Sequence, residues 1–193
     1  MLRGIKGTYV YVCDKNLKEY FARHISKFKT EKLITYLPLD KVIPFENSVP
    51  IYNLRAAAGN FSELQIVNVS DYEWIVLPSR YKPSKDLFAC KVEGESMNKV
   101  IPNGSICLFR KYSGGSRNGK IVLVEHTDKQ ESEFGSGYTV KEYQSKKNME
   151  DDQWSHESVT LKPLSHNSEY KDIEIAEDEL GSLKVIGIFE CVL

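Results

Sequence analysis

The chain has 193 residues, of which 41% are hydrophobic and 27% are charged. This length allows one good core, or one core with a small appendage. Lysine and arginine number 26 against 27 aspartates and glutamates, and the resulting net charge of -1 excludes a global attraction to nucleic acid or to an anionic membrane. Any contact of that kind must be local, so direct nucleic-acid binding is left open.

The cysteines and the apolar runs indicate a cellular compartment. Cys13, Cys90, Cys107 and Cys191 lack the C-x-x-C spacing of a zinc site, and three of them lie in apolar runs. We interpret them as buried free thiols in a reducing compartment. No apolar run approaches the roughly 18 residues of a membrane span, and the N-terminus lacks a signal-peptide pattern. We therefore predict a cytoplasmic protein with no membrane contact, metal or cofactor.

Residues 1–48 are predicted to form a small α/β appendage. Thr8 to Cys13 have the character of a short strand, and a helix is predicted after Asp14, which is a suitable N-cap. Residues 49–84 are predicted to be a linker that contains a first strand, Glu73 to Leu77, closed by Pro78. Apolar residues at helical spacing support the helix, at Leu17, Tyr20, Phe21 and Ile25.

Residues 85–193 are predicted to form a compact, mostly β domain built from hairpins. Turn residues such as Asn103-Gly104 and Gly114-Gly115 separate short apolar runs. The polar and charged segment Ser145–His156 is interpreted as an exposed hairpin loop. The predicted strands are Leu87–Val92, Ile106–Tyr112, Ile121–His126, Tyr138–Tyr143, Val159–Leu164, Ile173–Ile175 and Leu183–Leu193.

Ser96 lies in the turn Gly94-Glu95-Ser96-Met97, between the predicted strands Leu87–Val92 and Ile106–Tyr112. Gly and Ser are ordinary turn residues, so this turn alone does not indicate catalysis. A nucleophilic serine needs a base to accept its proton, and none of the four histidines lies in a recognisable triad motif. The other available base is a lysine kept neutral by burial, which lowers the pKa of its amine.

Lys141 is the candidate for that base, because it lies in the apolar strand "YTVKEY". By strand alternation Lys141 shares a face with Thr139 and Tyr143, so the Thr139 hydroxyl could hydrogen-bond and orient its amine. The alternative is that Lys141 is an ordinary strand residue facing solvent.

Three segments then follow one another in a specific order. "GESMNKVIPNGSICLF" contains Ser96, "YTVKEY" places Lys141 45 positions later, and "LKPLSHNSEYKDIEI" follows. Together they resemble the C-terminal domain of LexA, the UmuD proteins and phage repressors, a family of Ser-Lys self-cleaving peptidases. The resemblance implies a LexA-like peptidase β-fold, Ser96 as nucleophile and Lys141 as general base. It also implies an oxyanion hole made by backbone N–H groups at Ser96 and Met97.

The same resemblance implies a substrate inside the chain. LexA-like proteins cut themselves at a pair of small residues, typically Ala-Gly, upstream of the serine. In "LRAAAGNF" the pair Ala58-Gly59 precedes Ser96, with Gly59 lying 37 positions before it. Small side chains suit a bond that enters a narrow cleft as an extended strand, and glycine permits a sharp bend. The alternative is a flexible Ala/Gly linker.

The N-terminal segment "LRGIKGTYVYVCDKNLKEYF" has a different resemblance. It is similar to the tail of superfamily 1 helicases, in which a T-R-G-x-K-G segment precedes a strand, and Arg3 would lie at the position of the phosphate-sensing arginine. The chain has no G-x-x-x-x-G-K-[ST] loop and so cannot hydrolyse nucleotide on its own. We expect it to be the C-terminal part of a helicase-peptidase fusion, or to descend from one.

Two hypotheses for function follow. In the first, the chain is an intramolecular serine endopeptidase that cuts Ala58-Gly59 and so regulates a DNA-damage or phage-defence helicase or repressor, with a RecA-like nucleoprotein as an activator. In the second, it is a non-catalytic LexA-like module for dimerisation or docking. Ser96, Lys141 and the Ala-Gly pair together favour the first.

A homodimer is a further expectation. The run Leu183–Leu193 is apolar on both alternating faces, and such a strand needs cover on both. Either the N-terminal zone or a second copy covers one of its faces, or it is a central strand of the monomer. By alternation, one face carries Val185, Gly187, Phe189 and Cys191 and the other carries Ile186, Ile188 and Val192.

Overall fold

The computed structural model describes residues 3–5, 8–10, 34–52, 68–126, 137–150 and 153–193, and the chain divides into two units, Met1–Leu33 and Ile34–Leu193. In the first unit, β1 (Arg3–Ile5) and β2 (Thr8–Val10) form an antiparallel pair. β2 begins where a strand was predicted. The helix predicted after Asp14 lies outside the described residues.

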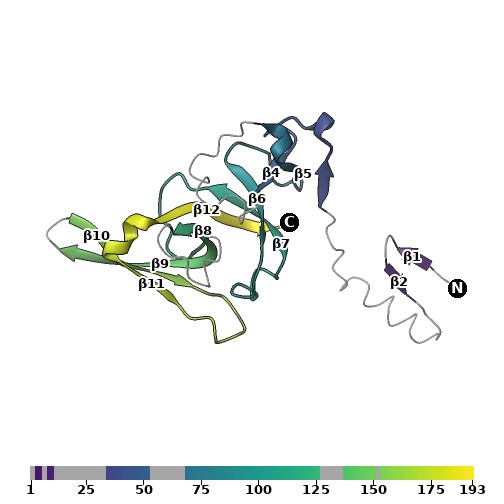
Figure 1. The fold of residues 1–193 in the computed structure, drawn as a ribbon. Coiled ribbons are helices and arrows are strands. Elements are labelled where there is room, and N and C mark those ends of the chain that lie inside the picture. The colour runs from purple at the N-terminus through teal and green to yellow at the C-terminus, as the bar shows by residue number, and fades with distance from the viewer. Residues whose placement is uncertain (1–2, 6–7, 11–33, 53–67, 127–136, 151–152) are drawn as a thin grey trace. The chain divides into compact units, whose positions relative to one another are not determined.

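The second unit is built on one ten-stranded sheet, with the strand order β11-β10-β9-β8-β12-β7-β6-β4-β5-β3 (Figure 1). Its strands are β3 (Thr35–Leu37), β4 (Val49–Tyr52), β5 (Glu73–Val76), β6 (Leu87–Val92), β7 (Ser105–Lys111), β8 (Lys120–His126), β9 (Tyr138–Glu150), β10 (Gln153–Lys162), β11 (Ile173–Ala176) and β12 (Leu183–Val192). Short 3-10 helices occur at η2 (Leu39–Lys41), η4 (Val69–Asp71) and η5 (Glu177–Ser182).

The mostly β prediction for the peptidase domain is confirmed, and each predicted strand from Leu87 onward corresponds to an observed one within a few residues, except that β9 and β10 are longer. The reason is that apolar runs alternate with turn residues whose backbone needs glycine. Gly104 and Gly119 both have positive φ, +76° and +74°, at the starts of β7 and β8. The first turn joins the neighbouring antiparallel strands β6 and β7, and the second leads from β7 to β8, on the other side of β12.

The prediction of a loop over Ser145–His156 is wrong. β9 continues to Glu150 and β10 begins at Gln153, so most of this segment is a two-stranded ladder. The ladder is made by main-chain hydrogen bonds, which polar side chains do not prevent. The composition of the segment therefore indicated exposure but not the absence of strands.

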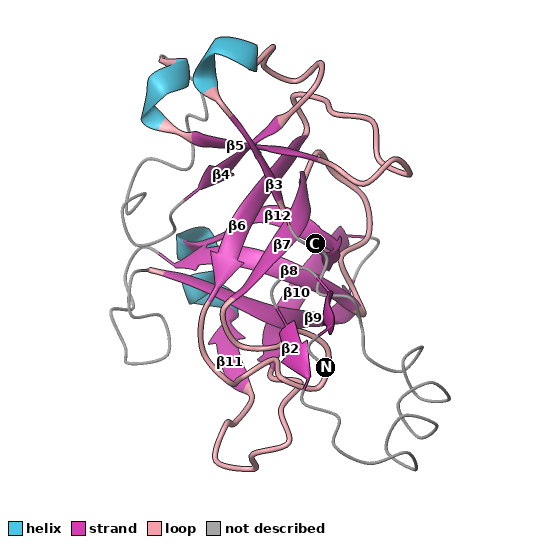
Figure 2. Cartoon of the chain, turned by 90° about the vertical axis from the view of Figure 1, so that its right-hand side faces the viewer, coloured by secondary structure: helices cyan, strands magenta, loops and turns pink. Residues whose placement is uncertain are grey.

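The start of the sheet differs from the predicted organisation. β3 and β4 were not predicted as strands, yet both belong to the ten-stranded sheet. The boundary between the two units falls at residues 33 and 34, whereas the sequence pattern placed the end of the appendage at residue 48. Figure 2 shows β3, β4 and β5 together at one end of the sheet.

β12 is a central strand. It pairs with β8 on one side and with β7 on the other, and its side chains enter three buried apolar clusters. Residues on both faces of this strand therefore pack against the same chain, although Ile188–Val192 stay partly exposed. The homodimer stays a prediction.

Two of the cysteine side chains are fully buried in the core, Cys90 and Cys107, while Cys191 is partly exposed; all three are free thiols. Burial raises the pKa of Cys107 to about 12 and the pKa of Cys90 well above its ordinary value. Cys13 lies outside the described residues. Among the described residues, no helix has the length and apolar character that crossing a membrane requires.

Candidate active site

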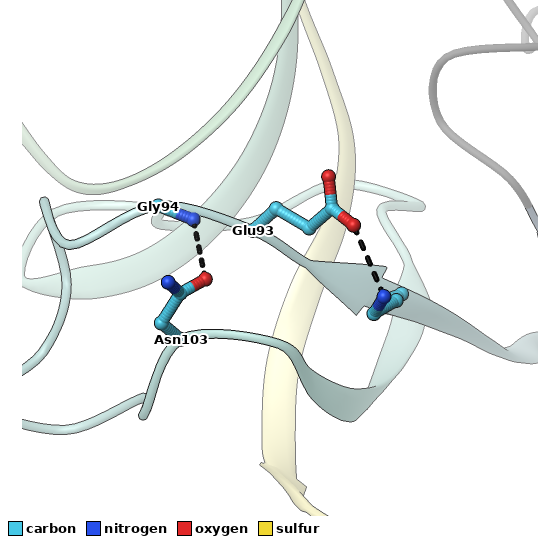
Figure 3. Close-up of polar contacts among 4 residues, drawn as sticks. Glu93, Gly94 and Asn103 are labelled. Carbon is cyan, nitrogen blue, oxygen red and sulfur yellow. Dashed lines mark hydrogen bonds and ion pairs between the residues drawn. The ribbon is translucent and has the colours of Figure 1, made fainter.

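The turn that carries Ser96 begins where β6 ends. Gly94 has a φ of +103°, a conformation that L-residues with side chains rarely adopt. Its N–H donates a hydrogen bond of 2.9 Å to Asn103 Oδ1 (Figure 3). The N–H of Gly104 donates another of 2.9 Å to the carbonyl of Val92. These bonds join the two sides of the loop between β6 and β7 and hold the start of the turn. Figure 3 also shows Glu93, which forms an exposed ion pair with Lys91 at 3.1 Å.

Met97 fixes the other side of the turn Gly94–Met97, which we call the nucleophile turn for the role proposed below. Its side chain is 1% exposed and belongs to the same buried cluster as Ile101 and Val92. The N–H groups of Val100 and Ile101 both donate to the Met97 carbonyl, at 2.9 and 2.8 Å. Ser96 is therefore held at the surface of the core, partly exposed, between a tight turn on one side and a buried anchor on the other.

Lys141 lies on β9 with 1% of its surface exposed. Its cross-strand partner is Val122 on β8, and Val122 is itself fully buried. Directly opposed side chains in an antiparallel pair lie close together, so the lysine stem packs beside an apolar neighbour. The alternative of a solvent-facing lysine is excluded by this burial.

The Lys141 amine has two hydroxyl partners. Its Nζ donates to Ser96 Oγ at 3.0 Å and to Thr139 Oγ1 at 2.8 Å. Ser96 and Lys141 are thus in direct contact although 45 positions separate them in the chain. Thr139 and Lys141 lie on the same face of β9, as strand alternation predicts.

The N–H groups of Ser96 and Met97 were predicted to form the oxyanion hole. Among the hydrogen bonds of the described part of the chain, neither group is a donor. The oxyanion hole therefore stays a prediction.

Asn98 was not singled out from the sequence. Its Nδ2 donates to Glu95 Oε2 at 2.9 Å, and its Oδ1 accepts from the N–H of His166 at 2.8 Å and from Ser165 Oγ at 3.3 Å. A main-chain bond of 2.9 Å from Lys99 N to the Leu164 carbonyl lies beside it. The side chain therefore ties the nucleophile turn to the loop that follows β10. The sequence signal was the asparagine itself, two positions after the serine, but a turn asparagine has many local partners.

The predicted scissile bond, Ala58-Gly59, lies outside the described residues. The strand before it, β4, runs parallel to β6, with Ile51 opposite Ala89 and Tyr52 opposite Cys90. β6 leads directly to the nucleophile turn. β4 and β6 therefore end toward the same end of the sheet, and Ser96 follows the end of β6.

Among the described residues, no three His, Cys, Asp or Glu side chains gather closely enough to hold a metal ion. The arrangement around Ser96 is that of a serine hydroxyl in contact with the amine of a buried lysine. Such a pair fits hydrolysis of an acyl bond.

Comparison with known families agrees with this chemistry. The Peptidase S24-like family matches residues 50–189. The chain belongs to this family. It is therefore a serine peptidase in its general class, and the S24-like domain contains both Ser96 and Lys141. The resemblance of the peptidase domain is confirmed, whereas the helicase resemblance of the N-terminal segment is not shown. No curated protein matches the chain.

Proposed function

We propose that this S24-like peptidase cuts its own chain, with Ser96 as nucleophile and Lys141 as general base. The observation that carries the proposal is the 3.0 Å hydrogen bond between Lys141 Nζ and Ser96 Oγ, made by an amine that is 1% exposed. Burial disfavours a charged ammonium, and a neutral amine has a lone pair that can accept the serine proton. No cofactor takes part in this scheme.

The reaction proceeds in two stages. Neutral Lys141 takes the proton of Ser96 Oγ as this oxygen bonds to the scissile carbonyl carbon, and the N–H groups at Ser96 and Met97 stabilise the negative oxygen that results. The resulting ammonium then gives its proton to the leaving amide nitrogen as the C–N bond breaks. This leaves an ester on Ser96. Water hydrolyses the ester in the second stage, with Lys141 again as base and then as acid.

Thr139 has a positioning role in this scheme. Its hydroxyl lies 2.8 Å from Lys141 Nζ and is itself 8% exposed. A second fixed partner limits the rotation of the amine and keeps its lone pair near the serine.

The proposed substrate is the Ala58-Gly59 bond of the same chain. Tyr52 lies opposite Cys90 in the parallel pair of β4 and β6. Ala58 follows Tyr52 by the same number of residues as Ser96 follows Cys90. Six residues span up to about 20 Å when extended, so the segment after β4 is long enough to bring its Ala-Gly pair to the serine. Small side chains at this pair favour entry into a narrow cleft.

The test is mass spectrometry of the purified chain after incubation at neutral and mildly alkaline pH. We expect two fragments, residues 1–58 and 59–193. Ser96→Ala should abolish cleavage, and Lys141→Arg should abolish it because a guanidinium stays protonated. Matched controls are Ser105→Ala and Lys120→Arg, which change the same residue types outside the dyad and should cleave at the parental rate.

Two results would count against the proposal. Cleavage that persists in Ser96→Ala or Lys141→Arg removes the assignment of the dyad. A parental chain that stays intact under all these conditions favours the non-catalytic docking module instead.

A further inference from the structure

We propose that cleavage at Ala58-Gly59 leaves the two fragments bound to each other as one folded unit. The position of the cut rests on the proposed function. The retention rests on β3 and β4, which lie on the N-terminal side of that bond and belong to the main sheet. The partner that residues 59–193 would hold is thus the fragment of residues 1–58.

The strand pairing interleaves the two fragments. β5, from the larger fragment, lies between β3 and β4, both from the smaller one. β3 pairs with it from Thr35 opposite Val76 to Leu37 opposite Trp74, and β4 pairs with it from Val49 opposite Ile75 to Ile51 opposite Glu73. On its other side β4 pairs with β6, which also belongs to the larger fragment.

Buried side chains reinforce this pairing. Val49 is fully buried in one cluster with Ile75 and Leu87. Tyr52 is 4% exposed, and its ring packs edge-on against Phe88 at 5.6 Å between centroids. These residues lie on both sides of the proposed cut, so the core itself spans the two fragments.

Two further aromatic contacts cross between the fragments. The rings of Tyr52 and Tyr72 meet edge-on at 5.2 Å, one ring before the undescribed segment and one after it. Phe45 meets Trp74 in the same manner at 5.6 Å. The Tyr52-Tyr72 contact holds the two ends of the 53–71 segment together whether or not a bond inside it is cut.

Separation of the fragments would be costly for this reason. β5 would lose its pairing strands on both sides, and β6 would become an open edge. Fully buried apolar side chains such as Val49, Ile75 and Phe88 would return to water. The immediate product of the cut is therefore a nicked domain with a new C-terminus at Ala58 and a new N-terminus at Gly59, and not a released N-terminal piece.

The experiment should not depend on self-cleavage. The Ser96→Ala chain receives the recognition sequence of a site-specific protease within residues 54–66 and is cut with that protease. We expect two bands on a denaturing gel, but a single species with the mass of the uncut chain by size exclusion with light scattering at micromolar concentration. Separate elution of the fragments under native conditions would overturn the inference.

A matched pair of variants tests the role of β4. Tyr52→Ala removes a buried ring, whereas Tyr36→Ala removes a ring of the same fragment that is 48% exposed. In the cut chain, Tyr52→Ala should raise the dissociation constant of the fragments about tenfold or more, and Tyr36→Ala should leave it near the parental value. Equal effects of the two variants would contradict the proposed docking by β4.

Circular dichroism of the uncut variants shows whether each one still folds. If Tyr52→Ala does not, Val49→Ala deletes less buried volume on the same strand and takes its place. Failure of the inference and failure of the proposed function are distinguishable. Fragments that separate after the foreign cut refute retention, whereas a parental chain that never cuts itself refutes only the self-cleavage.

Discussion

At the scale of single residues, the central feature of the candidate site is the buried amine of Lys141. Lys141 has an apolar cross-strand neighbour and two hydroxyl partners, and almost none of its surface reaches water. Burial of an ionisable group costs stability unless it is paired. The hydroxyls of Ser96 and Thr139 supply hydrogen-bond partners for this buried amine.

The first prediction concerns pH. Cleavage should become faster from neutral to mildly alkaline pH, because only neutral Lys141 can accept the serine proton and its neutral fraction rises with pH. The measurement is a time course of fragment formation by mass spectrometry at several pH values in this range. A flat profile would argue against a lysine base.

Ionisation of buried thiols at high pH lowers the stability of the folded chain and so limits the pH range in which cleavage rates can be compared. Burial raises the pKa of Cys107 from 9.0 to about 12, so the folded state keeps a proton that the unfolded state loses. The stability linked to this thiol is fully present below a pH of about 9 and is lost as pH rises toward about 12. Urea unfolding at each pH should show this loss, and cleavage rates are comparable only where the chain remains folded.

The residues of the proposed catalytic site could be predicted from the sequence better than the residues that support them. Ser96, Lys141 and Thr139 follow from a turn, an apolar strand and strand alternation, and the structure brings all three together. Asn98 and Asn103 could not be predicted in the same way. Asn98 accepts from His166 in another loop, whereas Asn103 accepts from Gly94, nine positions away in its own loop. The sequence does not tell which partner a turn asparagine takes, because such a residue can bond locally or at a distance.

At the scale of elements, the predicted strands were wrong where the side-chain pattern does not reflect the main-chain hydrogen bonding. The β9-β10 ladder runs through a polar segment that looked like a loop. In β12 the strand was predicted, but its side chains were assigned to two faces on the assumption of strict alternation. Register shifts occur between Val185 and Gly187 and between Phe189 and Cys191, and each irregularity changes which side chains share a face.

Glycine at position 187 marks one of these irregularities. A Cβ there would lie 3.0 Å from the Arg110 carbonyl oxygen and 3.0 Å from the Phe88 ring. Gly187 and Ile188 are each paired both with β7 and with β8. Close approach of a backbone and a buried ring therefore requires glycine at this point of the central strand.

The second prediction tests the link between the nucleophile turn and the loop after β10. Asn98→Ala removes the bonds to Glu95, Ser165 and His166, and we expect the cleavage rate to fall about tenfold, which corresponds to roughly 1.4 kcal/mol of positioning. The rate is measured as fragment formation under conditions where the parental chain cuts itself.

Asn167→Ala is the matched control for this link. The bonds of Asn167 are made with Ser165 and Glu169, inside its own loop, and do not reach the nucleophile turn. This variant should cleave at nearly the parental rate. Equal loss of rate in both variants would show that the loop matters as a whole and that the Asn98 link has no separate role.

At the scale of the whole molecule, the peptidase fold depends on strands that precede the matched family region. The family match begins at residue 50, whereas β3 and Phe45, whose ring meets the buried Trp74, lie before it. Sequence pattern placed β3 and Phe45 with the appendage because the apolar run that contains β3 is short and is interrupted by Pro38. Long-range pairing with β5 decides their place, and that pairing leaves no local signal.

The third prediction compares two truncations at these boundaries. A chain of residues 34–193 keeps the whole ten-stranded sheet and the Ser96-Lys141 contact, so it should fold and cut itself at roughly the parental rate, within about twofold. A chain of residues 49–193 loses β3 and the Phe45 ring, which leaves β5 as an edge strand and uncovers Trp74. We expect this loss to cost about 3 kcal/mol or more, because the aromatic contact of the buried Trp74 and a strand ladder disappear together.

Urea unfolding of the two Ser96→Ala chains measures the difference without interference from cleavage. Equal midpoints would mean that residues 34–48 do not stabilise the peptidase domain, and the domain boundary would then return to residue 48.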